Sequence, residues 1–520
     1  MTWEPELEEL RRREALAHAM GGEERVARQR AAGKLTVRER IDRLLDDGTF
    51  HETGALAGAG SYDADGELEG FLPANMVVGQ GEVEGRGVVV QGDDFTVRGG
   101  AADAAIWQKM VHAERMAHDL RLPLARLVDG TGGGGSVKSL EQMGFTYVPF
   151  LPGMEIAVAN LAIVPVVAAA LGPVAGLGAA RVVASHFSVI VRGSAQLFVA
   201  GPPVVAAAMG EAPDKEALGG SRLQTRAGAV DSEAADEDDA LAQLRRFLSY
   251  LPSSVWELPP VVAATDDPER REQELLEIVP RDPRKPYAMR RILEAVFDRG
   301  SVFELGARHG RSLICALARL DGRPVGVLAS DPKHYGGGLT GDASDKLTRF
   351  VDLCDQFRLP VVNMVDQPGF VIGTEAERAG TMRRGARALF SVYQATVPWA
   401  SVLVRKVYGV AGAAHADGSR LNVRFAWPSG DWGSLPIAGG LEAAYRRELE
   451  AAEDPVALRA EIEARLNAVR SPFRTAERFS VEEIIDPRDT RPLLCAWARR
   501  AHEVVAHERG GGAKSRGPRP

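Results

Sequence analysis

The chain has 520 residues, enough for two to four domains, and its hydrophobic (45%) and charged (26%) fractions are those of an ordinary globular protein. A formal net charge of −8 disfavours nucleic acid as the main partner, although a local basic face would be compatible with it. The three cysteines, Cys315, Cys354 and Cys495, form no CxxC pair, so they indicate neither a disulfide framework nor a cysteine zinc site, and we expect a reducing compartment.

The N-terminal stretch alternates acidic and basic side chains without an apolar run, so it is typical of neither a signal peptide nor an anchor. We therefore expect a cytoplasmic protein. The run 156–180 is uncharged and long enough to span a bilayer. However, Pro165 and Pro173 interrupt it and small residues dominate it, so a buried helix, a buried strand and a turn are the favoured interpretation, and we expect no membrane segment.

The two halves of the chain repeat each other. GRGVVVQGDD (85–94) returns as GRPVGVLASD (322–331), and RLPLARLVD (121–129) returns as RLPVVNMVD (358–366), both at the same displacement along the chain. In each copy, short β-rich runs alternate with helical stretches, which predicts parallel strands joined by crossover helices. The predicted fold class is therefore α/β, in two duplicated domains.

Two weaker echoes extend the repeat. VAG at 174–176 returns at 410–412, at a displacement shorter by a single position, and GTFHETG from Gly48 is echoed by GSVFELG from Gly300. The second echo has a clearly different displacement, so we expect a length change between the two matches.

A stretch rich in proline and charge, near residues 250–285, is the natural domain boundary. We predict an N-terminal domain over 1–260, a C-terminal domain over 261–508, and a basic, disordered tail over 509–520. The acidic run 231–239 is expected to be the solvated start of a helix rather than a metal site.

A loop of almost pure glycine, VDGTGGGGSVKS (128–139), follows one predicted strand. A phosphate-binding P-loop requires glycine before its lysine, but Val137 precedes Lys138, so that motif fails. The loop returns after the matching strand as VDQPGFVIG (365–373), which argues against a disposable linker. Glycine after a strand lets backbone N–H groups approach a ligand oxygen without a side chain in the way.

Two turns of small residues suit catalysis by such N–H groups. They are GPVAGLGAA (172–180) and YGVAGAA (408–414), one in each half. Two N–H groups aimed at one point form an oxyanion hole, which stabilises a thioester carbonyl as it becomes an enolate. Close packing between helix and strand is the alternative explanation for each single turn.

Titratable side chains are weaker candidates. His186, His334 and His415 lie near the glycine turns, but no Ser/His/Asp or metal-ligand spacing links them, so we expect structural roles. Asp129 and Asp366 end buried strands, where aspartate commonly caps the following turn. The sequence therefore favours catalysis by backbone dipoles over catalysis by a titrating side chain.

Ordered motifs over nearly the whole chain resemble the carboxyltransferase (β) subunit of the biotin-dependent acyl-CoA carboxylases, the group of propionyl-CoA and methylcrotonyl-CoA carboxylase. The matching stretches are GKLTVRERIDRLLDDGTF (33–50), DDFTVRGGA (93–101), LFVAGPPVV (197–205), LGGSRLQTRAGAVD (218–231), DPRKPYAMRRIL (282–293), VDQPGFVIGTEAERAGTMRRGARAL (365–389), ATVPWASVLVRKVYG (395–409) and AWPSGDWG (426–433).

This resemblance implies two crotonase-like domains. The N-terminal domain of one subunit would hold the acyl-CoA, the C-terminal domain of another would hold biotin, and the site would lie at a dimer interface within a homo-hexamer. Biotin would arrive on a separate protein together with a biotin carboxylase, because the chain has no MKM attachment motif, and no metal is implied for this chain. The implied reaction is transfer of CO2 from carboxybiotin to the α carbon of an acyl-CoA through an enolate.

The resemblance also implies roles for individual residues. The N–H groups of Gly176 and Leu177 would face the acyl carbonyl, and those of Val410 and Ala411 the biotin carbonyl. The remaining implied contacts are Gly132, Gly133, Gly134 and Ala413 with the substrate, and Gly369, Phe370 and Gly409 on the biotin side.

The chain departs from the family pattern at both turns. Relatives usually have Gly-Gly-Ala where this chain has Gly176-Leu177-Gly178 and Gly409-Val410-Ala411. We expect Leu177 and Val410 to crowd the ligands or to restrict the φ angle that the turn needs.

Other departures concern the substrate. Gly134 stands at the arginine position of the family's DSGGAR loop, and the small Ala413 stands where relatives select acyl length. These departures predict a wider pocket or an altered activity. Two alternatives remain open: a decarboxylase-type enzyme that moves CO2 from a malonyl-type thioester to biotin, and a non-catalytic paralogue that binds acyl-CoA.

Overall fold

A computed structural model of the chain describes residues 2–100, 106–130, 140–141, 143–421 and 423–507. The chain forms two compact units, Met1–Glu257 and Leu258–Gly510. The predicted tail, 509–520, lies outside the described residues. The run 156–180 forms the end of one helix, two short strands and the start of another helix. In the described part of the chain, no helix is both long and apolar enough to cross a bilayer.

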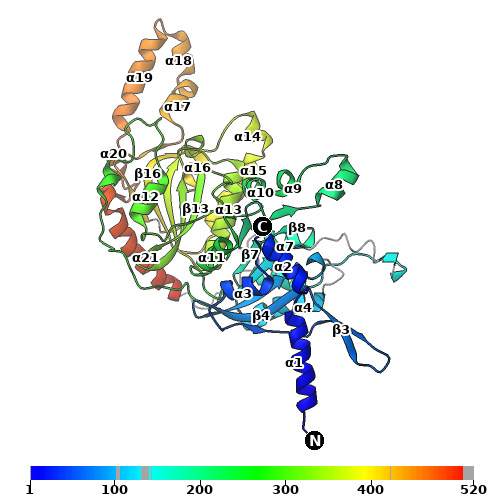
Figure 1. Cartoon of the computed structure of the whole chain (residues 1–520). Coiled ribbons are helices and arrows are strands. Elements are labelled where there is room, and N and C mark those ends of the chain that lie inside the picture. The colour runs from blue at the N-terminus through cyan, green and yellow to red at the C-terminus, as the bar shows by residue number, and fades with distance from the viewer. Residues whose placement is uncertain (1, 101–105, 131–139, 142, 422, 508–520) are drawn as a thin grey trace. The chain divides into compact units, whose positions relative to one another are not determined.

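The first unit contains helices on both faces of a sheet (Figure 1). Its helices are α1 (Glu4–His18), α2 (Glu23–Ala31), α3 (Val37–Leu44), α4 (Trp107–Leu120), α6 (Met154–Asn160), α7 (Leu177–Val183), α8 (Pro202–Met209), α9 (Lys215–Gly219), α10 (Ser221–Ala227), α11 (Glu237–Leu248) and the 3-10 turn η1 (Arg98–Gly100). Its strands are β1 (His51–Glu52), β2 (Gly58–Tyr62), β3 (Leu68–Pro73), β4 (Met76–Val83), β5 (Arg86–Asp93), β6 (Leu124–Val128), β7 (Val166–Ala170), β8 (Pro173–Ala175), β9 (Phe187–Val191), β10 (Gln196–Phe198) and β11 (Ser232–Ala234).

The main sheet of this unit has seven strands in the order β1-β4-β5-β6-β7-β9-β11, parallel from β5 onward. The side chain of Gln91 donates to the carbonyl of Met110 in α4, whereas a Cβ atom on the next residue, Gly92, would meet Val37 of α3. Because successive residues of a strand face opposite sides of a sheet, α4 and α3 cover opposite faces. Helix α11 packs on β9, with the Phe187 and Phe247 rings stacked at 5.0 Å.

The second unit has the same architecture (Figure 1). Its helices are α12 (Met289–Val296), α13 (Gly341–Gln356), α14 (Thr374–Arg378), α15 (Thr381–Gln394), α16 (Gly409–Ala413), α17 (Ile437–Ala444), α18 (Arg446–Ala451), α19 (Pro455–Val469), α20 (Pro472–Glu477), α21 (Thr490–His507) and the 3-10 turns η3 (Gln273–Leu276), η4 (Tyr335–Gly337) and η5 (Pro487–Asp489). Its strands are β12 (Phe303–Leu305), β13 (Leu313–Leu320), β14 (Arg323–Ser330), β15 (Val361–Gln367), β16 (Trp399–Tyr408), β17 (Val423–Ala426), β18 (Asp431–Gly433) and β19 (Glu483–Ile484).

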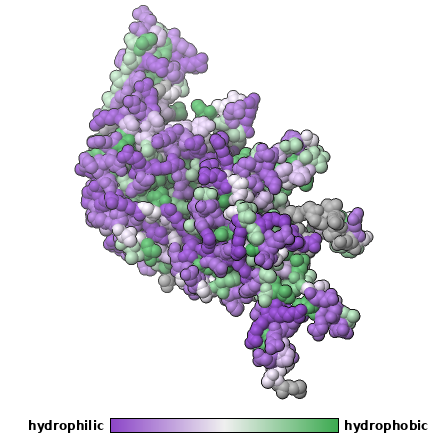
Figure 2. All heavy atoms as spheres, in the orientation of Figure 1, coloured by the Kyte–Doolittle hydropathy of each residue, from purple (hydrophilic) through white to green (hydrophobic). Residues whose placement is uncertain are grey.

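Its sheet runs in the order β12-β13-β14-β15-β16-β17-β19, with β18 paired to the end of β16. Val325 and Val327 of β14 belong to a core that includes residues of α12 and α21. A Cβ atom on the intervening Gly326 would meet the side chains of Phe350 and Cys354 in α13. Helices therefore cover both faces of this sheet as well. Hydrophilic residues make up most of the surface seen in Figure 2.

The repeat found in the sequence has the same register in the structure. Met76 pairs with Asp93 between β4 and β5, and Leu313 pairs with Ser330 between β13 and β14, so both members of the pair keep the displacement of the sequence repeat. A pair of left-handed non-glycine residues is matched as well, because Arg121 has a φ of 57° and Arg358 a φ of 58°. The predicted duplicated α/β fold is confirmed.

The looser echo is structural too. His51 of β1 pairs with Gln80, and Phe303 of β12 pairs with Leu317. The number of residues between β1 and β12 is thus larger than the number between β4 and β13, the strands with which they pair. The β2–β3 hairpin of the first unit accounts for the extra length, because β12 is followed by β13 after only the short loop 306–312.

The VAG echo is wrong as a structural match. Pro173–Ala175 (β8) pairs in parallel with β10, and Lys406–Tyr408, the end of β16, pairs in parallel with β18. These pairs make Gly176 equivalent to Gly409, whereas the VAG match would make it equivalent to Gly412. The two turns are therefore offset from the alignment that the sequence suggests.

Candidate active site

The turn of the first unit forms where β8 meets α7. Gly176 lies there with φ 60° and ψ −125°. A Cβ atom at this position would meet nothing within 4 Å, so the backbone conformation, not lack of space, requires glycine. The N–H of Gly176 donates to the Phe198 carbonyl at 3.3 Å. Leu177 and Gly178 are the first residues of α7, so their N–H groups have no partner within the helix.

The turn of the second unit has the same form at the start of α16. Gly409 has a φ of 61°, and Val410 and Ala411 follow it in the first turn of the helix. The Val410 side chain is 62% exposed, whereas Ala411 is buried. Leu177 and Val410 are both absent from the left-handed residues of the described chain. The expected restriction of φ therefore does not arise, because glycine occupies the left-handed position of each turn.

The C-terminal end of α16 is anchored through one carbonyl. The carbonyl oxygen of His415 accepts hydrogen bonds from Asn363 Nδ2 (3.0 Å), Trp399 Nε1 (2.8 Å) and Ser401 Oγ (3.1 Å). The His415 ring donates from Nδ1 to the Gly412 carbonyl at 2.7 Å. Burial lowers the pKa of His415, so the ring is neutral at pH 7 and its observed contacts are structural.

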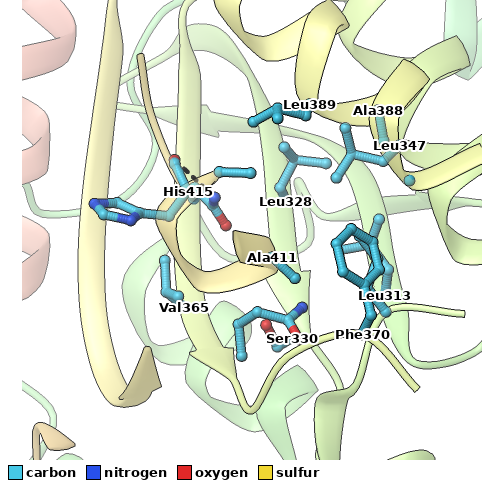
Figure 3. Close-up of a pocket in the computed structure, with 15 residues that line it drawn as sticks. Leu313, Leu328, Ser330, Leu347, Val365, Phe370, Ala388, Leu389, Ala411 and His415 are labelled. Atoms are coloured by element: carbon cyan, nitrogen blue, oxygen red, sulfur yellow. Dashed lines mark hydrogen bonds between the residues drawn. The ribbon is translucent and has the colours of Figure 1, made fainter. Parts of the chain in front are cut away.

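A pocket of the second unit lies beside α16 (Figure 3). Phe370 and Ala411, both singled out from the sequence, face the same space, while the His415 ring points away from them. The lining is mostly apolar, and its full membership is Leu313, Leu328, Ser330, Leu339, Leu347, Asn363, Val365, Gln367, Phe370, Gly385, Ala388, Leu389, Ala411, Ala414 and His415. The structure thus brings together two of the predicted biotin-side residues.

The other predicted residues on the biotin side do not line this pocket. Gly369 has a φ of 124°, its N–H donates to Gln367 Oε1 at 3.0 Å, and its carbonyl accepts from the Leu339 N–H. Gly409 is half-buried. Ala413, which was predicted to contact the substrate, lies at the end of α16 and is exposed. Gly132, Gly133 and Gly134 lie outside the described residues.

Asp129, directly after β6, is fully buried and pairs with two cations. Its carboxylate accepts hydrogen bonds from Lys34 Nζ at 2.6 and 2.8 Å and lies 2.8 Å from Arg40 Nη1. Arg40 also pairs with Glu237. Burial opposes the charge on Arg40, but attraction to Asp129 and bonding to Glu237 outweigh it and raise its pKa. The charges of this cluster are therefore paired.

Asp366, near the end of β15, is also fully buried and ion-paired. It accepts from Arg405 Nη2 at 2.9 Å and from the backbone N–H of Lys406 at 2.9 Å. The Arg405 guanidinium lies 4.8 Å from the centre of the Tyr287 ring. Burial, with the nearby Asp366 charge, raises the pKa of Tyr287 well above its usual value. Asp366 is thus structural, but through an ion pair with the next strand instead of the predicted turn cap.

The cations of these pairs do not stand out in the sequence. Lys34 and Arg40 lie in the family stretch GKLTVRERIDRLLDDGTF, and Arg405 lies in ATVPWASVLVRKVYG. A signal was therefore present, but it identified the family without indicating which carboxylate each cation contacts.

The remaining sequence candidates have structural contacts. His186 is buried, accepts at Nδ1 from the Val166 N–H and donates from Nε2 to the Leu161 carbonyl. His334 lies 4.0 Å from Asp331. Asp236 caps α11 by accepting from the Asp239 N–H at 2.8 Å, which confirms the predicted helix start in the acidic run. The run is not wholly solvated as predicted, because Glu237 is buried and pairs with Arg40. Over the described ranges, no group of three or more His, Cys, Asp or Glu side chains is placed to hold a metal ion.

Residues 28–506 match the family of the carboxyl transferase domain. The chain is 38% identical over 502 residues to the carboxyltransferase subunit of propionyl-CoA carboxylase from Haloferax mediterranei, with 95% of this chain and 96% of the relative covered. It is 32% identical to the α subunit of methylmalonyl-CoA decarboxylase from Veillonella parvula, with 95% of each covered.

Among solved structures, the chain resembles transcarboxylase 12S with methylmalonyl-coenzyme A bound, with a TM-score of 0.86 and 32% identity over 99% of this chain and 98% of that one. Sequence and structure therefore agree over nearly the whole length. The chain belongs to the carboxyl transferase domain family and is an acyl-CoA carboxyltransferase with the duplicated crotonase-like fold of that family.

Proposed function

We propose that this chain transfers a carboxyl group from biotin, carried on a separate protein, to the α carbon of an acyl-CoA thioester, and that its two turns act as two oxyanion holes. The observation that carries the proposal is the match between Gly176 and Gly409, one in each unit, each with a left-handed φ directly before the first free N–H groups of a helix. The reaction has two carbonyl partners, so two such turns suit it.

The structural register refines which N–H groups take part. Val410 and Ala411 are the donors proposed for the biotin carbonyl. Their equivalents in the first unit are Leu177 and Gly178, and the N–H of Gly176 is already bonded to the Phe198 carbonyl. We therefore assign the acyl carbonyl to the N–H groups of Leu177 and Gly178, while Gly176 provides the left-handed backbone that aims them.

The residues of the second-unit pocket fit a biotin ring system. Phe370 and the pocket's leucines supply apolar walls, and Asn363 and Gln367 supply polar groups at the same site. When bound, carboxybiotin supplies the CO2 and then the base that takes the α proton. The chain itself stabilises charge: Leu177 and Gly178 donate to the thioester oxygen, and Val410 and Ala411 donate to the ureido oxygen. The neutral His415 ring is bonded to Gly412 and need not titrate.

The proposed partners follow from the relatives. We propose a biotin carboxylase and a biotin carrier as partner proteins, and a homo-oligomer, because the transcarboxylase 12S core is described as a hexamer. Propionyl-CoA and methylmalonyl-CoA appear in the names of the relatives, so a short acyl-CoA is the expected substrate class. The small, exposed Ala413 favours tolerance of a longer acyl chain.

A panel of acyl-CoA thioesters, tested with the purified chain, its partner, ATP and labelled bicarbonate, checks this function. The expected result is label in the acyl-CoA product for at least one short thioester. The similarity to methylmalonyl-CoA decarboxylase supports a second candidate, transfer from a malonyl-type thioester to biotin. That direction would appear as label leaving methylmalonyl-CoA without net carboxylation. Binding of acyl-CoA with no transfer in either direction would contradict both and support the non-catalytic alternative.

A further inference from the structure

The two strand-end aspartates have cations of different origin at the same place in the fold. The register that matches Gly176 with Gly409 also matches Gly172 with Arg405. A Cβ atom at position 172 would lie 1.9 Å from Asp129 Oδ1 and 2.8 Å from Lys34 Nζ. In the first unit, then, the Asp129 carboxylate and the Lys34 ammonium together occupy the space that a side chain at 172 would need. In the second unit, the side chain at that position is Arg405 itself.

Each ion pair touches the segment that leads into its turn. Asp129 lies against Gly172, shortly before Gly176, and the neighbouring Leu171 N–H donates to the Val128 carbonyl at 2.9 Å. Between Gly172 and Gly176 lies only β8, which is held by its parallel pairing with β10. A shift of the Asp129 carboxylate would therefore be transmitted to the turn through a short, paired strand.

The second unit makes the same connection through a backbone bond. The pairing of β15 with β16 changes register between Val365 and Gln367. Asp366 lies at that irregularity, and its carboxylate accepts the Lys406 N–H, shortly before Gly409. Arg405, held by Asp366 and by the Lys285 carbonyl at 3.0 Å, fixes the adjacent residue. The carboxylate thus holds the strand at the point where it leaves its regular ladder.

We infer that Asp129–Lys34 and Asp366–Arg405 are matched positioning pairs, each of which sets the placement of the N–H groups of its own turn. The inference rests on the proposed function, in which the first turn acts on the acyl-CoA and the second on biotin. Donors displaced by about 1 Å cost on the order of 100-fold in rate, so a pair within one short strand of its turn can control it. The two pairs should then affect different substrates.

Transfer of the carboxyl group from methylmalonyl-CoA to free biotin tests this assignment on the full-length chain. The variants are Asp366→Asn and Arg405→Lys in the second unit, and Asp129→Asn and Lys34→Arg in the first. We expect the second-unit variants to raise the KM for biotin about tenfold while the Kd of acyl-CoA, measured by calorimetry, stays within about twofold. We expect the first-unit variants to weaken acyl-CoA binding and to leave the KM for biotin within about twofold.

Circular dichroism would reveal any loss of folding in the aspartate variants. The conservative changes Arg405→Lys and Lys34→Arg keep the charge, so they still test the inference if the aspartate variants do not fold. A merely structural role would change both constants together, and that result, or no change in either, would overturn the inference. Transfer by the wild-type chain tests the proposed function separately. If the wild type fails to transfer, the calorimetric comparison of Asp129→Asn with Asp366→Asn still decides whether the first pair serves acyl-CoA.

Discussion

Gly176 and Gly409 have almost identical φ angles, 60° and 61°, although the residues that follow them, Leu177 and Val410, differ in shape. Both glycines come directly after a short parallel pairing, of β8 with β10 and of β16 with β18. The two units thus share the positive φ at this glycine, whereas the side chains that follow it differ. The positive φ of the glycine is therefore the feature that the two turns share.

Replacing either glycine with alanine should lower carboxyl transfer strongly. A non-glycine residue in such a conformation costs about 1–3 kcal/mol, and the turn would relax and displace its N–H donors. The matched controls are Gly48→Ala and Gly300→Ala, at positions with φ angles of 72° and 74° and nothing within 4 Å of a new Cβ atom. All four variants should lose similar stability in urea unfolding. Equal loss of transfer by the controls would show that general strain, not the turns, is responsible.

Trimming Val410 should improve access to the second turn. The side chain is 62% exposed beside the proposed biotin donors, so Val410→Ala removes two methyl groups with little loss of packing. The expected changes are a KM for free biotin that falls about twofold to fivefold, and a free energy of unfolding within about 0.5 kcal/mol of the wild type. Val456→Ala on α19, where the side chain is 77% exposed, is the control and should change neither value. A higher KM in Val410→Ala would mean that this side chain contacts biotin favourably.

Removing the buried Arg40 should destabilise the first unit. Arg40→Met leaves the buried carboxylates of Asp129 and Glu237 with one cation fewer, and breaking a buried pair in this way costs about 3–5 kcal/mol. The measurement is urea unfolding followed by circular dichroism. Arg28→Met breaks an exposed pair with Glu24 and should have no measurable effect. A small loss in Arg40→Met would indicate that Lys34 alone balances the cluster.

Stability should fall as the pH drops below about 6.5, the ordinary pKa of histidine. Burial lowers the pKa of His334, His415 and His502, so in this window the unfolded chain binds more protons than the folded chain, and unfolding becomes easier as the pH falls. His415→Gln should reduce this dependence of the melting temperature on pH. His507→Gln, at the exposed end of α21, should leave the pH profile as it is. An unchanged profile in His415→Gln would assign the effect to other groups.

The sequence predicted the fold well because the repeat carries strand register directly. The stretches beginning at Gly85 and Gly322 have the same spacing as the paired strands that they form. The sequence comparison gave the wrong match at VAG, because three identical residues suggested equivalent positions. Only the pairing of β8 with β10 and of β16 with β18 reveals the offset between the two turns.

The ion pairs could not be found by the same reasoning. Lys34 and Asp129 are 95 residues apart, and no periodicity links a helix start to a strand end. The sequence located the two turns, since a glycine after a strand has a conformational meaning that sequence shows, and the catalytic role of their N–H groups stays a prediction. Which N–H was already bonded required the position of the Phe198 carbonyl, and therefore the folded chain.

The two units differ in which segment of the chain supplies the cation that balances the strand-end aspartate. In the second unit, the cation that balances Asp366 is Arg405, which belongs to β16, the strand that leads into the turn. In the first unit, Asp129 is balanced by Lys34, which lies in the segment that precedes α3 and not in the strand that leads into the turn. A chain shortened past that lysine would keep every strand of the first unit and yet leave Asp129 with Arg40 as its remaining cation. The residues that precede α3 therefore contribute to the charge balance of the first unit.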